Sequence, residues 1–148
     1  MTPALLDVNV LLALFWPTHV HHAAANRWFR QNAASGWVTC PMTECGFVRI
    51  SSNPRIIQGC LMPQQALQVL RNNLSHPHHI FWADDFSLKS TIDWPMDLLV
   101  SHRQVTDAYL LSLAIHKGGR LATLDRRMSS LLATDSPHHD ALVLVPVE

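Results

Sequence analysis

Five short apolar segments, separated for the most part by helical patterns, restrict the folds that this chain can adopt. Strands that alternate with helices favour parallel pairing, because each connection must cross back over the sheet. A chain of 148 residues has the length of one domain. We therefore predict a single α/β domain over residues 1–148, with a central, mostly parallel sheet of about five strands and helices on both faces. The predicted strands are residues 3–8, 37–40, 79–83, 120–124 and 141–147.

Helical spacing of apolar residues fills most of the intervals between these strands. Asn9 is well placed to cap the first helix. We make no assignment for residues 87–100, where Trp94 is a candidate for contact with an unstacked base. The predicted helices are residues 10–16, a stripe that starts at Val20 and stops before Gly36, 42–50, 63–74, 106–115 and a short helix that ends at Leu132.

Four acidic residues occupy related positions in this pattern. Asp7 ends the first predicted strand and Asp125 the fourth, whereas Glu44 and Asp107 lie in first helical turns. In an open parallel sheet, strand carboxyl ends and the helix starts that follow them share one edge. Each acid alone could simply cap a helix or complete a turn. Together they would repel one another unless a cation neutralises them or some take up protons, and an oxygen-only ligand set suits Mg²⁺ or Mn²⁺.

The charge balance argues against a nucleic-acid binder with an overall basic field. The chain has 11 Lys and Arg residues and 11 Asp and Glu residues, so any RNA contact must come from a local patch. Ordinary solvated surface positions are the alternative for each arginine near the acids. The candidates for holding RNA phosphates are Arg49, Arg103, Arg126 and Arg127.

Ten histidines are an unusual feature, and most occur in clumps at residues 19–22, 76–79 and 138–139. Because the spacing matches no zinc motif, we expect solvated loop histidines. The longest apolar runs, such as Val10–Trp16, are far too short to span a membrane, and the N-terminus has no signal-peptide pattern. We therefore expect no membrane association and a cytoplasmic protein.

The four acids lie in motifs that resemble those of the PIN-domain toxins called VapC. The motifs are LLDVNVLLAL from Leu5, TECGFVR from Thr43, VTDAYLLSLA from Val105 and LATLD from Leu121, in the family's order and spacing over nearly the whole chain. The resemblance implies a Rossmann-like sheet and a metal-dependent endoribonuclease. It also implies the toxin of a toxin–antitoxin pair, usually a homodimer, that a small VapB-like antitoxin neutralises.

The resemblance also assigns roles to individual residues. Asp7, Glu44, Asp107 and Asp125 correspond to the family's acidic quartet, which is catalytic and holds Mg²⁺ or Mn²⁺. Asp7 and Asp107 are expected to be direct ligands, whereas Glu44 and Asp125 could bind directly, bind through water, or help to activate the nucleophile. Asn9 and Thr123 correspond to supporting polar residues near the metal.

Other functions remain as alternatives at this point. A haloacid-dehalogenase-like phosphatase would also end its first strand with an Asp, but it requires a second Asp two residues later, where this chain has Asn9. A phospho-receiver domain would need a late lysine, and a dinucleotide-binding fold would need a glycine-rich turn after the first strand. A PIN-like module that binds RNA or a protein without catalysis is the alternative from another class.

Overall fold

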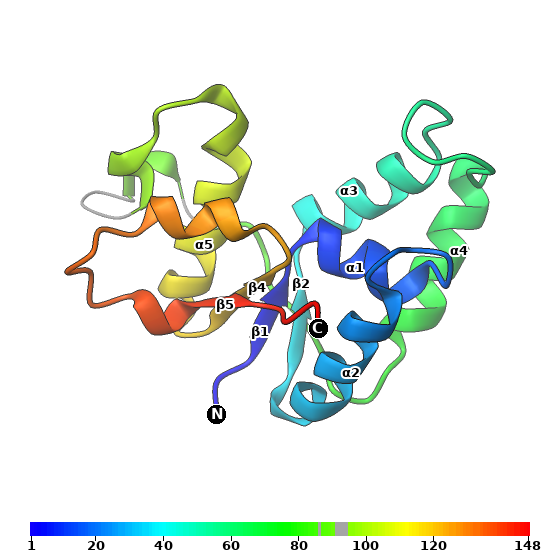
Figure 1. Ribbon diagram of the computed structural model, residues 1–148, viewed down its shortest axis with the longest axis horizontal. Helices are drawn as coiled ribbons and strands as arrows, with labels where there is room; N and C mark the ends of the chain where they lie inside the picture. The colour runs from blue at the N-terminus through cyan, green and yellow to red at the C-terminus, as the bar shows by residue number, and fades with distance from the viewer. Residues whose placement is uncertain (86, 91–94) are drawn as a thin grey trace.

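The central sheet of the computed structural model, which describes residues 1–85, 87–90 and 95–148, consists of five parallel strands. Their order is β3-β2-β1-β4-β5, and every neighbouring pair is parallel. The predicted α/β fold class is therefore confirmed (Figure 1). The strands are β1 (Ala4–Leu6), β2 (Trp37–Thr39), β3 (His79–Phe81), β4 (Arg120–Thr123) and β5 (Leu142–Leu144).

The helices follow the predicted intervals closely. Proline occupies the start of both α3 and α4, where its missing N–H costs no hydrogen bond. The segment after Asp125 is a 3-10 helix, and the described residues 87–90 and 95–100 include the short 3-10 helices η2 and η3. The helices are α1 (Val8–Phe15), α2 (His22–Asn32), α3 (Pro41–Ser51), α4 (Pro63–Leu74) and α5 (Val105–His116), and the 3-10 helices are η1 (Ala33–Ser35), η2 (Leu88–Ser90), η3 (Pro95–Leu98), η4 (His102–Gln104), η5 (Arg126–Leu131) and η6 (His139–Ala141).

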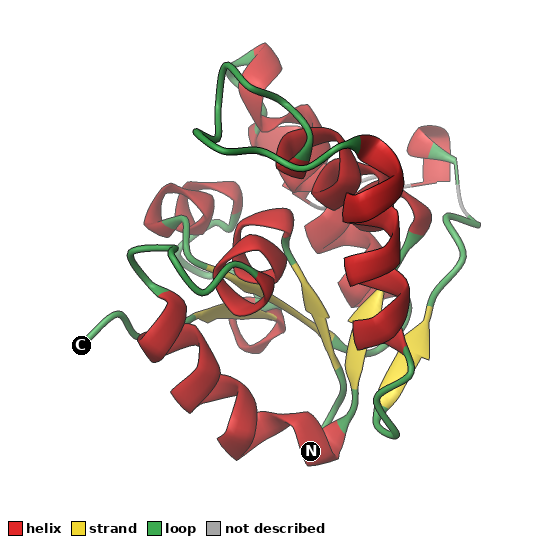
Figure 2. Cartoon of the chain, turned by 90° about the vertical axis from the view of Figure 1, so that its right-hand side faces the viewer, coloured by secondary structure: helices red, strands yellow, loops and turns green. Residues whose placement is uncertain are grey.

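Alternate residues of the strands build two separate cores, one on each face of the sheet. Leu6 and Trp37 pack with α1, α2, α3 and α4 on one face, whereas Leu5 and Leu121 pack with α5 on the other. This is the two-residue period of a strand that is buried on both sides. Figures 1 and 2 show the same arrangement, with the strands lying between helices.

The order of the strands creates a switch point between β1 and β4. The chain runs outward from β1 through β2 to β3, and then returns to place β4 on the other side of β1. Leu6 lies opposite Ala122, and the Asp7 N–H donates to the Ala122 carbonyl at 2.9 Å. The carboxyl ends of β1 and β4 therefore deliver Asp7, Thr123 and Asp125 to the position where open α/β sheets bind ligands.

Two further expectations concern membrane-spanning helices and Trp94. Among the residues that the structure describes, no helix is long and apolar enough to cross a membrane. Trp94, the candidate for base stacking, lies outside the described residues.

Candidate active site

The hydroxyl of Thr123 joins the ends of β1 and β4. Thr123 is fully buried, and its Oγ1 donates to Asp7 Oδ2 at 2.8 Å. The same oxygen accepts from Asn9 Nδ2 at 3.1 Å and from the Asp125 N–H at 3.0 Å. The Asn9 Oδ1 in turn accepts from the Leu124 N–H at 3.1 Å. The two polar residues assigned as supporting groups therefore lie between two of the predicted acids.

Asp7 itself caps α1, which corrects the expectation that Asn9 could do so. The Val8 N–H donates to Asp7 Oδ1 at 2.7 Å, and the helix begins at Val8, two residues earlier than predicted. Asn9 lies inside the helix, so its side chain is free to bond Thr123 and the start of the β4 loop. Burial raises the pKa of Asp7, against the opposing effect of the hydrogen bonds from Thr123 and Val8.

Asp107 lies in the first turn of α5 and interacts electrostatically with the other two aspartates. Burial, followed by the charges of Asp7 and then of Asp125, raises the pKa of Asp107 to about 6. Charges perturb one another in this way only over short distances. Asp107 also lines one cavity with Asp125, whose N–H shares the Thr123 hydroxyl with Asp7. These three aspartates therefore lie in one region, and we call them the aspartate cluster.

Glu44 is placed differently from the aspartate cluster. Its Oε2 accepts from the Thr39 hydroxyl at 2.6 Å, and its charge acts on His79 of β3. Cys45 and Arg49, on another face of α3, line the cavity that contains Asp7. The Glu44 carboxylate thus lies toward the β3 edge of the sheet, and Glu44 lines neither of the cavities that the other three acids line.

His76 and His79 are part of this same edge, which corrects the expectation of solvated loop histidines for these two, whereas His78 is an exposed turn residue as expected. His79 Nε2 lies 2.7 Å from Thr39 Oγ1, and Trp37 Nε1 donates to His76 Nδ1 at 3.1 Å. Burial lowers the pKa of His79. Since Thr39 donates to Glu44, it can accept from His79, and a chain of three polar groups links α3, β2 and β3.

The sequence interpretation missed Asp84 as a residue of this region. Asp84 lies shortly after β3 and lines, with Asp7, Arg49 and Thr106, a cavity of about 410 Å³ beside α3. The rule that selected Asp7 and Asp125, an acid at the carboxyl end of a parallel strand, applies equally to this residue.

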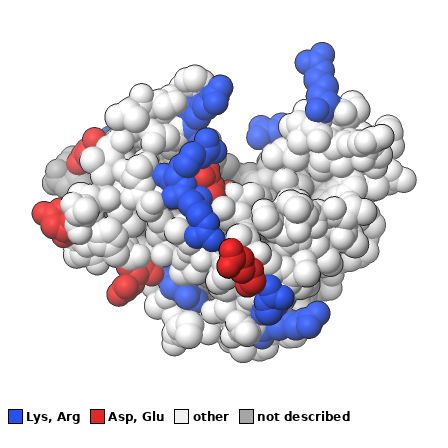
Figure 3. All heavy atoms as spheres, viewed as in Figure 1, with Lys and Arg blue, Asp and Glu red and all other residues white. Residues whose placement is uncertain are grey.

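A second cavity, of about 260 Å³, lies on the α5 side of the cluster. Asp107 and Asp125 line it together with Arg103 and Arg127. Arg49 therefore lines the α3-side cavity and two other candidate arginines line the α5-side cavity, whereas Arg126 is exposed and lines neither. Figure 3 shows this face hollowed between the α5 and α3 sides, with basic side chains on both rims and acidic atoms beside them.

The carboxylate of Asp125 is held by Arg127. The guanidinium donates from Nε to Oδ1 at 3.0 Å and from Nη2 to Oδ2 at 3.1 Å, and this pair lowers the pKa of Asp125. Within residues 1–85, 87–90 and 95–148, no three His, Cys, Asp or Glu side chains are already arranged as a metal site.

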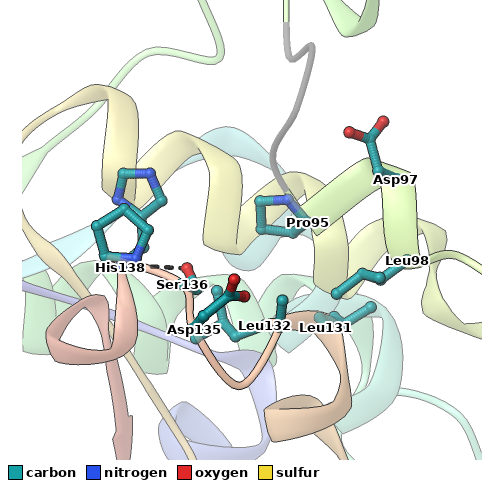
Figure 4. Close-up of a pocket in the computed structure, with 10 residues that line it drawn as sticks. Pro95, Asp97, Leu98, Leu131, Leu132, Asp135, Ser136 and His138 are labelled. Atoms are coloured by element: carbon teal, nitrogen blue, oxygen red, sulfur yellow. Dashed lines mark hydrogen bonds between the residues drawn. The ribbon is translucent and has the colours of Figure 1, made fainter.

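A further cavity, of about 380 Å³, lies between η3 and the segment that follows η5 (Figure 4). Asp97 and Asp135 stand at its margins, and the His138 N–H donates to Ser136 Oγ at 3.1 Å. Its lining contains none of the aspartate cluster, so we do not assign it to the same site.

Comparisons with known proteins match this chain to a family. The family model described as PIN domain matches residues 4–132. The chain is 49% identical over 126 residues to ribonuclease VapC39 of Mycobacterium tuberculosis, which covers 85% of this chain and 91% of the relative. It is 48% identical over 128 residues to ribonuclease VapC38 of the same organism, which covers 86% and 89%.

A solved structure resembles the fold over nearly its whole length. It is the crystal structure of VapBC2 from Rickettsia felis bound to a DNA fragment from their promoter, with a TM-score of 0.59 and 14% sequence identity, covering 97% of each chain. At this identity the likeness supports the fold alone.

Proposed function

This chain belongs to the PIN-domain family, and we propose that it is the ribonuclease toxin of a toxin–antitoxin pair, an endonuclease that hydrolyses RNA phosphodiester bonds. The observation that carries the proposal is the convergence of Asp7, Asp107 and Asp125 at the switch point of the sheet. The relatives named ribonuclease VapC, at 49% and 48% identity, support it independently.

The aspartate cluster fits a hard divalent cation. Its donors are all carboxylate oxygens, which Mg²⁺ and Mn²⁺ prefer. Asp7 is 7% exposed, and the pKa of Asp107 is raised to about 6 because burial and its two acidic neighbours disfavour its charge. A bound cation would relieve this repulsion. In our proposal Asp7 and Asp107 hold the cation directly, and Asp125 joins them when its carboxylate is free of Arg127.

Glu44 remains the fourth acid of the proposed quartet, but its role differs from that of the three aspartates. Because its carboxylate lies beside Thr39 and His79 and not in the cavities lined by the aspartate cluster, direct contact with a cation there would require its side chain to change conformation. In the observed conformation Glu44 steadies the start of α3, the helix that carries Arg49. Its contribution to the site is therefore positional in this conformation.

The chemistry divides between the cation and the protein. A bound Mg²⁺ or Mn²⁺ ion would lower the pKa of a water molecule and neutralise charge that develops on the phosphate. Thr123 and the Val8 N–H each donate to one oxygen of Asp7. The orientation of that carboxylate is therefore fixed before a ligand binds. Asn9 fixes Thr123 and the Leu124 backbone in the same way.

Local basic residues provide the proposed RNA contacts. Arg49 borders the cluster on one side and Arg103 and Arg127 on the other, so a phosphate over the cluster would meet guanidinium groups from both sides. Arg126, which is exposed next to them, extends the same patch. Since the formal net charge of the chain is zero, we expect these arginines to account for most of the salt dependence of RNA binding.

The proposal includes partners and a location. A VapB-like antitoxin protein would neutralise the toxin, and the chain itself would form a homodimer. Cellular RNA as substrate implies a cytoplasmic protein. Association with a purified candidate antitoxin, measured by light scattering, tests the first two points together.

Cleavage of labelled RNA separates the enzyme from a PIN-like module that only binds. We expect the wild-type chain to cleave with Mg²⁺ or Mn²⁺ and to stop when EDTA is added. Asp107→Asn should reduce the cleavage rate by roughly 100-fold or more, since removing one group that stabilises transition-state charge commonly costs this much. Asp140→Asn, at an exposed carboxylate in η6, is the matched control and should cleave like the wild type. Metal-dependent RNA binding without cleavage would instead favour the binding module.

A further inference from the structure

Arg127 makes a bidentate ion pair with one member of the aspartate cluster. Its Nε and Nη2 donate to the two carboxylate oxygens of Asp125 at 3.0 and 3.1 Å, and its backbone N–H donates to Oδ1 at 3.0 Å. Both oxygens of Asp125 are thus occupied by donors from a single residue. Parallel, charge-assisted bonds of this kind are the strong form of a carboxylate contact.

The charge of Arg127 also reaches the rest of the cluster. It lines the α5-side cavity together with Asp107 and Asp125, and it opposes the effects that raise the pKa of Asp107. The guanidinium therefore neutralises part of the charge that a divalent cation would neutralise. It is a positive group that the chain itself supplies to the acidic site.

The contact can be exchanged easily. The side chain of Arg127 is 88% exposed, whereas that of Asp125 is 23% exposed, so no packing holds the guanidinium in place. Within the part of the chain that the structure describes, the adjacent Arg126 makes no ion pair. The two arginines have the same charge and nearly the same distance along the chain from Asp125, but only one engages it.

We propose that Arg127 is an internal counter-ion that competes with the divalent cation for Asp125, and that cation binding releases its guanidinium to contact an RNA phosphate. This inference rests on the proposed function. A contact that stabilises only the metal-free state must weaken metal binding by the same factor.

The test is a calorimetric titration of the full chain with Mg²⁺ at low ionic strength, comparing the wild type, Arg127→Gln and Arg126→Gln. An exposed ion pair is worth enough to change an equilibrium constant by roughly two- to fivefold. We therefore expect Arg127→Gln to bind Mg²⁺ roughly two- to fivefold more tightly than the wild type. Its metal-free form should unfold at a lower temperature. Arg126→Gln should match the wild type in both measurements.

A lysine at the same position separates geometry from charge. Arg127→Lys keeps the charge but loses the two parallel hydrogen bonds, so its Mg²⁺ affinity should fall between those of the wild type and Arg127→Gln. In NMR spectra, Mg²⁺ should change the Nε–H resonance of Arg127 as the ion pair with Asp125 breaks. Equal or weaker Mg²⁺ binding by Arg127→Gln, or the same increase in Arg126→Gln, would overturn the inference.

The RNA cleavage assay distinguishes failure of the counter-ion inference from failure of the proposed function. A wild-type chain that cleaves RNA while Arg127→Gln shows no gain in Mg²⁺ affinity would overturn the counter-ion inference alone. A chain that shows the predicted gain but cleaves no RNA would support the competition between Arg127 and Mg²⁺ for Asp125 and overturn the proposed function. If the wild type bound no Mg²⁺ at all, both would fail.

Discussion

At the scale of single residues, the site depends on one buried hydroxyl. Thr123 Oγ1 donates to Asp7, and it accepts from Asn9 and from the Asp125 backbone, so three polar groups share one oxygen atom. A buried hydroxyl with every bonding direction used is expensive to remove, because its partners stay buried without it. The carboxylates would keep their sequence positions without this hydroxyl but would lose their common orientation.

Replacing Thr123 with valine tests this role, since valine has nearly the same shape. We expect Thr123→Val to lower the free energy of unfolding by about 1–3 kcal/mol, because Asp7 loses a donor and the Asp125 N–H loses its acceptor. Urea denaturation measures the change. Thr123→Ser restores the hydroxyl and should recover most of the loss. A valine variant as stable as the wild type would show that water or a neighbour replaces the hydroxyl.

The raised pKa of Asp107 predicts an unusual pH dependence for the metal-free protein. The folded-state pKa is about 6 and lies above the ordinary value of 3.8, so the protonated form is favoured in the folded state. Its stabilising contribution is complete below about pH 4 and is lost as the pH rises through 6. In EDTA, Asp107→Asn should therefore become more stable than the wild type as the pH rises from 4 to 7.

Denaturation of the two proteins across this pH range measures the effect. The difference should reach about 1 kcal/mol, a figure reduced for solvent screening at a half-buried group. A difference that does not change with pH would show that Asp107 ionises normally in the folded chain. Taking the difference between two proteins removes the contributions of the histidines, which titrate in the same range.

At the scale of elements, the sequence predicted the strands and helices well and the side-chain directions less well. Apolar runs and proline starts located β1, β4, α3 and α4 to within a few residues, because burial on both sheet faces leaves a strong pattern. The expectation that Asn9 caps α1 was wrong, since Asp7 is an equally good capping residue two positions earlier. Backbone geometry, which the sequence pattern does not specify, selected Asp7.

The direction of the Glu44 side chain is a second feature that the sequence pattern did not predict. A rule about sheet edges places the start of α3 at the correct edge, but one residue along a helix rotates a side chain by about 100°. Cys45 and Arg49 lie on the face toward Asp7, whereas Glu44 reaches Thr39. Asp84 was overlooked although the same rule applies to it. It follows β3, and an acid at the carboxyl end of a parallel strand lies at the ligand-binding edge.

The orientation of α3 gives a prediction about Glu44. Gln at position 44 can still accept from Thr39, so Glu44→Gln should keep its fold and most of the stabilisation that Mg²⁺ provides. Asp107→Asn should lose nearly all of it. Thermal unfolding of both variants with and without Mg²⁺ compares them directly. If Glu44→Gln loses as much as Asp107→Asn, the carboxylate of Glu44 must turn to bind the metal.

At the scale of the whole molecule, the strand order matters more than the overall charge. Only the return of the chain from β3 to β4 makes β4 a neighbour of β1, and that step brings Asp125 beside Asp7 across more than 100 residues of sequence. The net charge of zero gives no long-range attraction for RNA. The proposed RNA contacts therefore depend on the two cavities that the aspartate cluster and its arginines line. Figure 3 shows Lys and Arg side chains on both rims of a hollow in the surface.

The most direct test of the central claim, that the aspartate cluster is a divalent-cation site, is the unfolding midpoint of the wild-type chain in EDTA and in Mg²⁺. At 100 times its dissociation constant, a ligand that binds only the folded state adds about 2.7 kcal/mol, so the midpoint should rise by several degrees. Asp107→Asn should show little or no rise. A wild-type midpoint that is identical in EDTA and in saturating Mg²⁺ or Mn²⁺ would contradict the account.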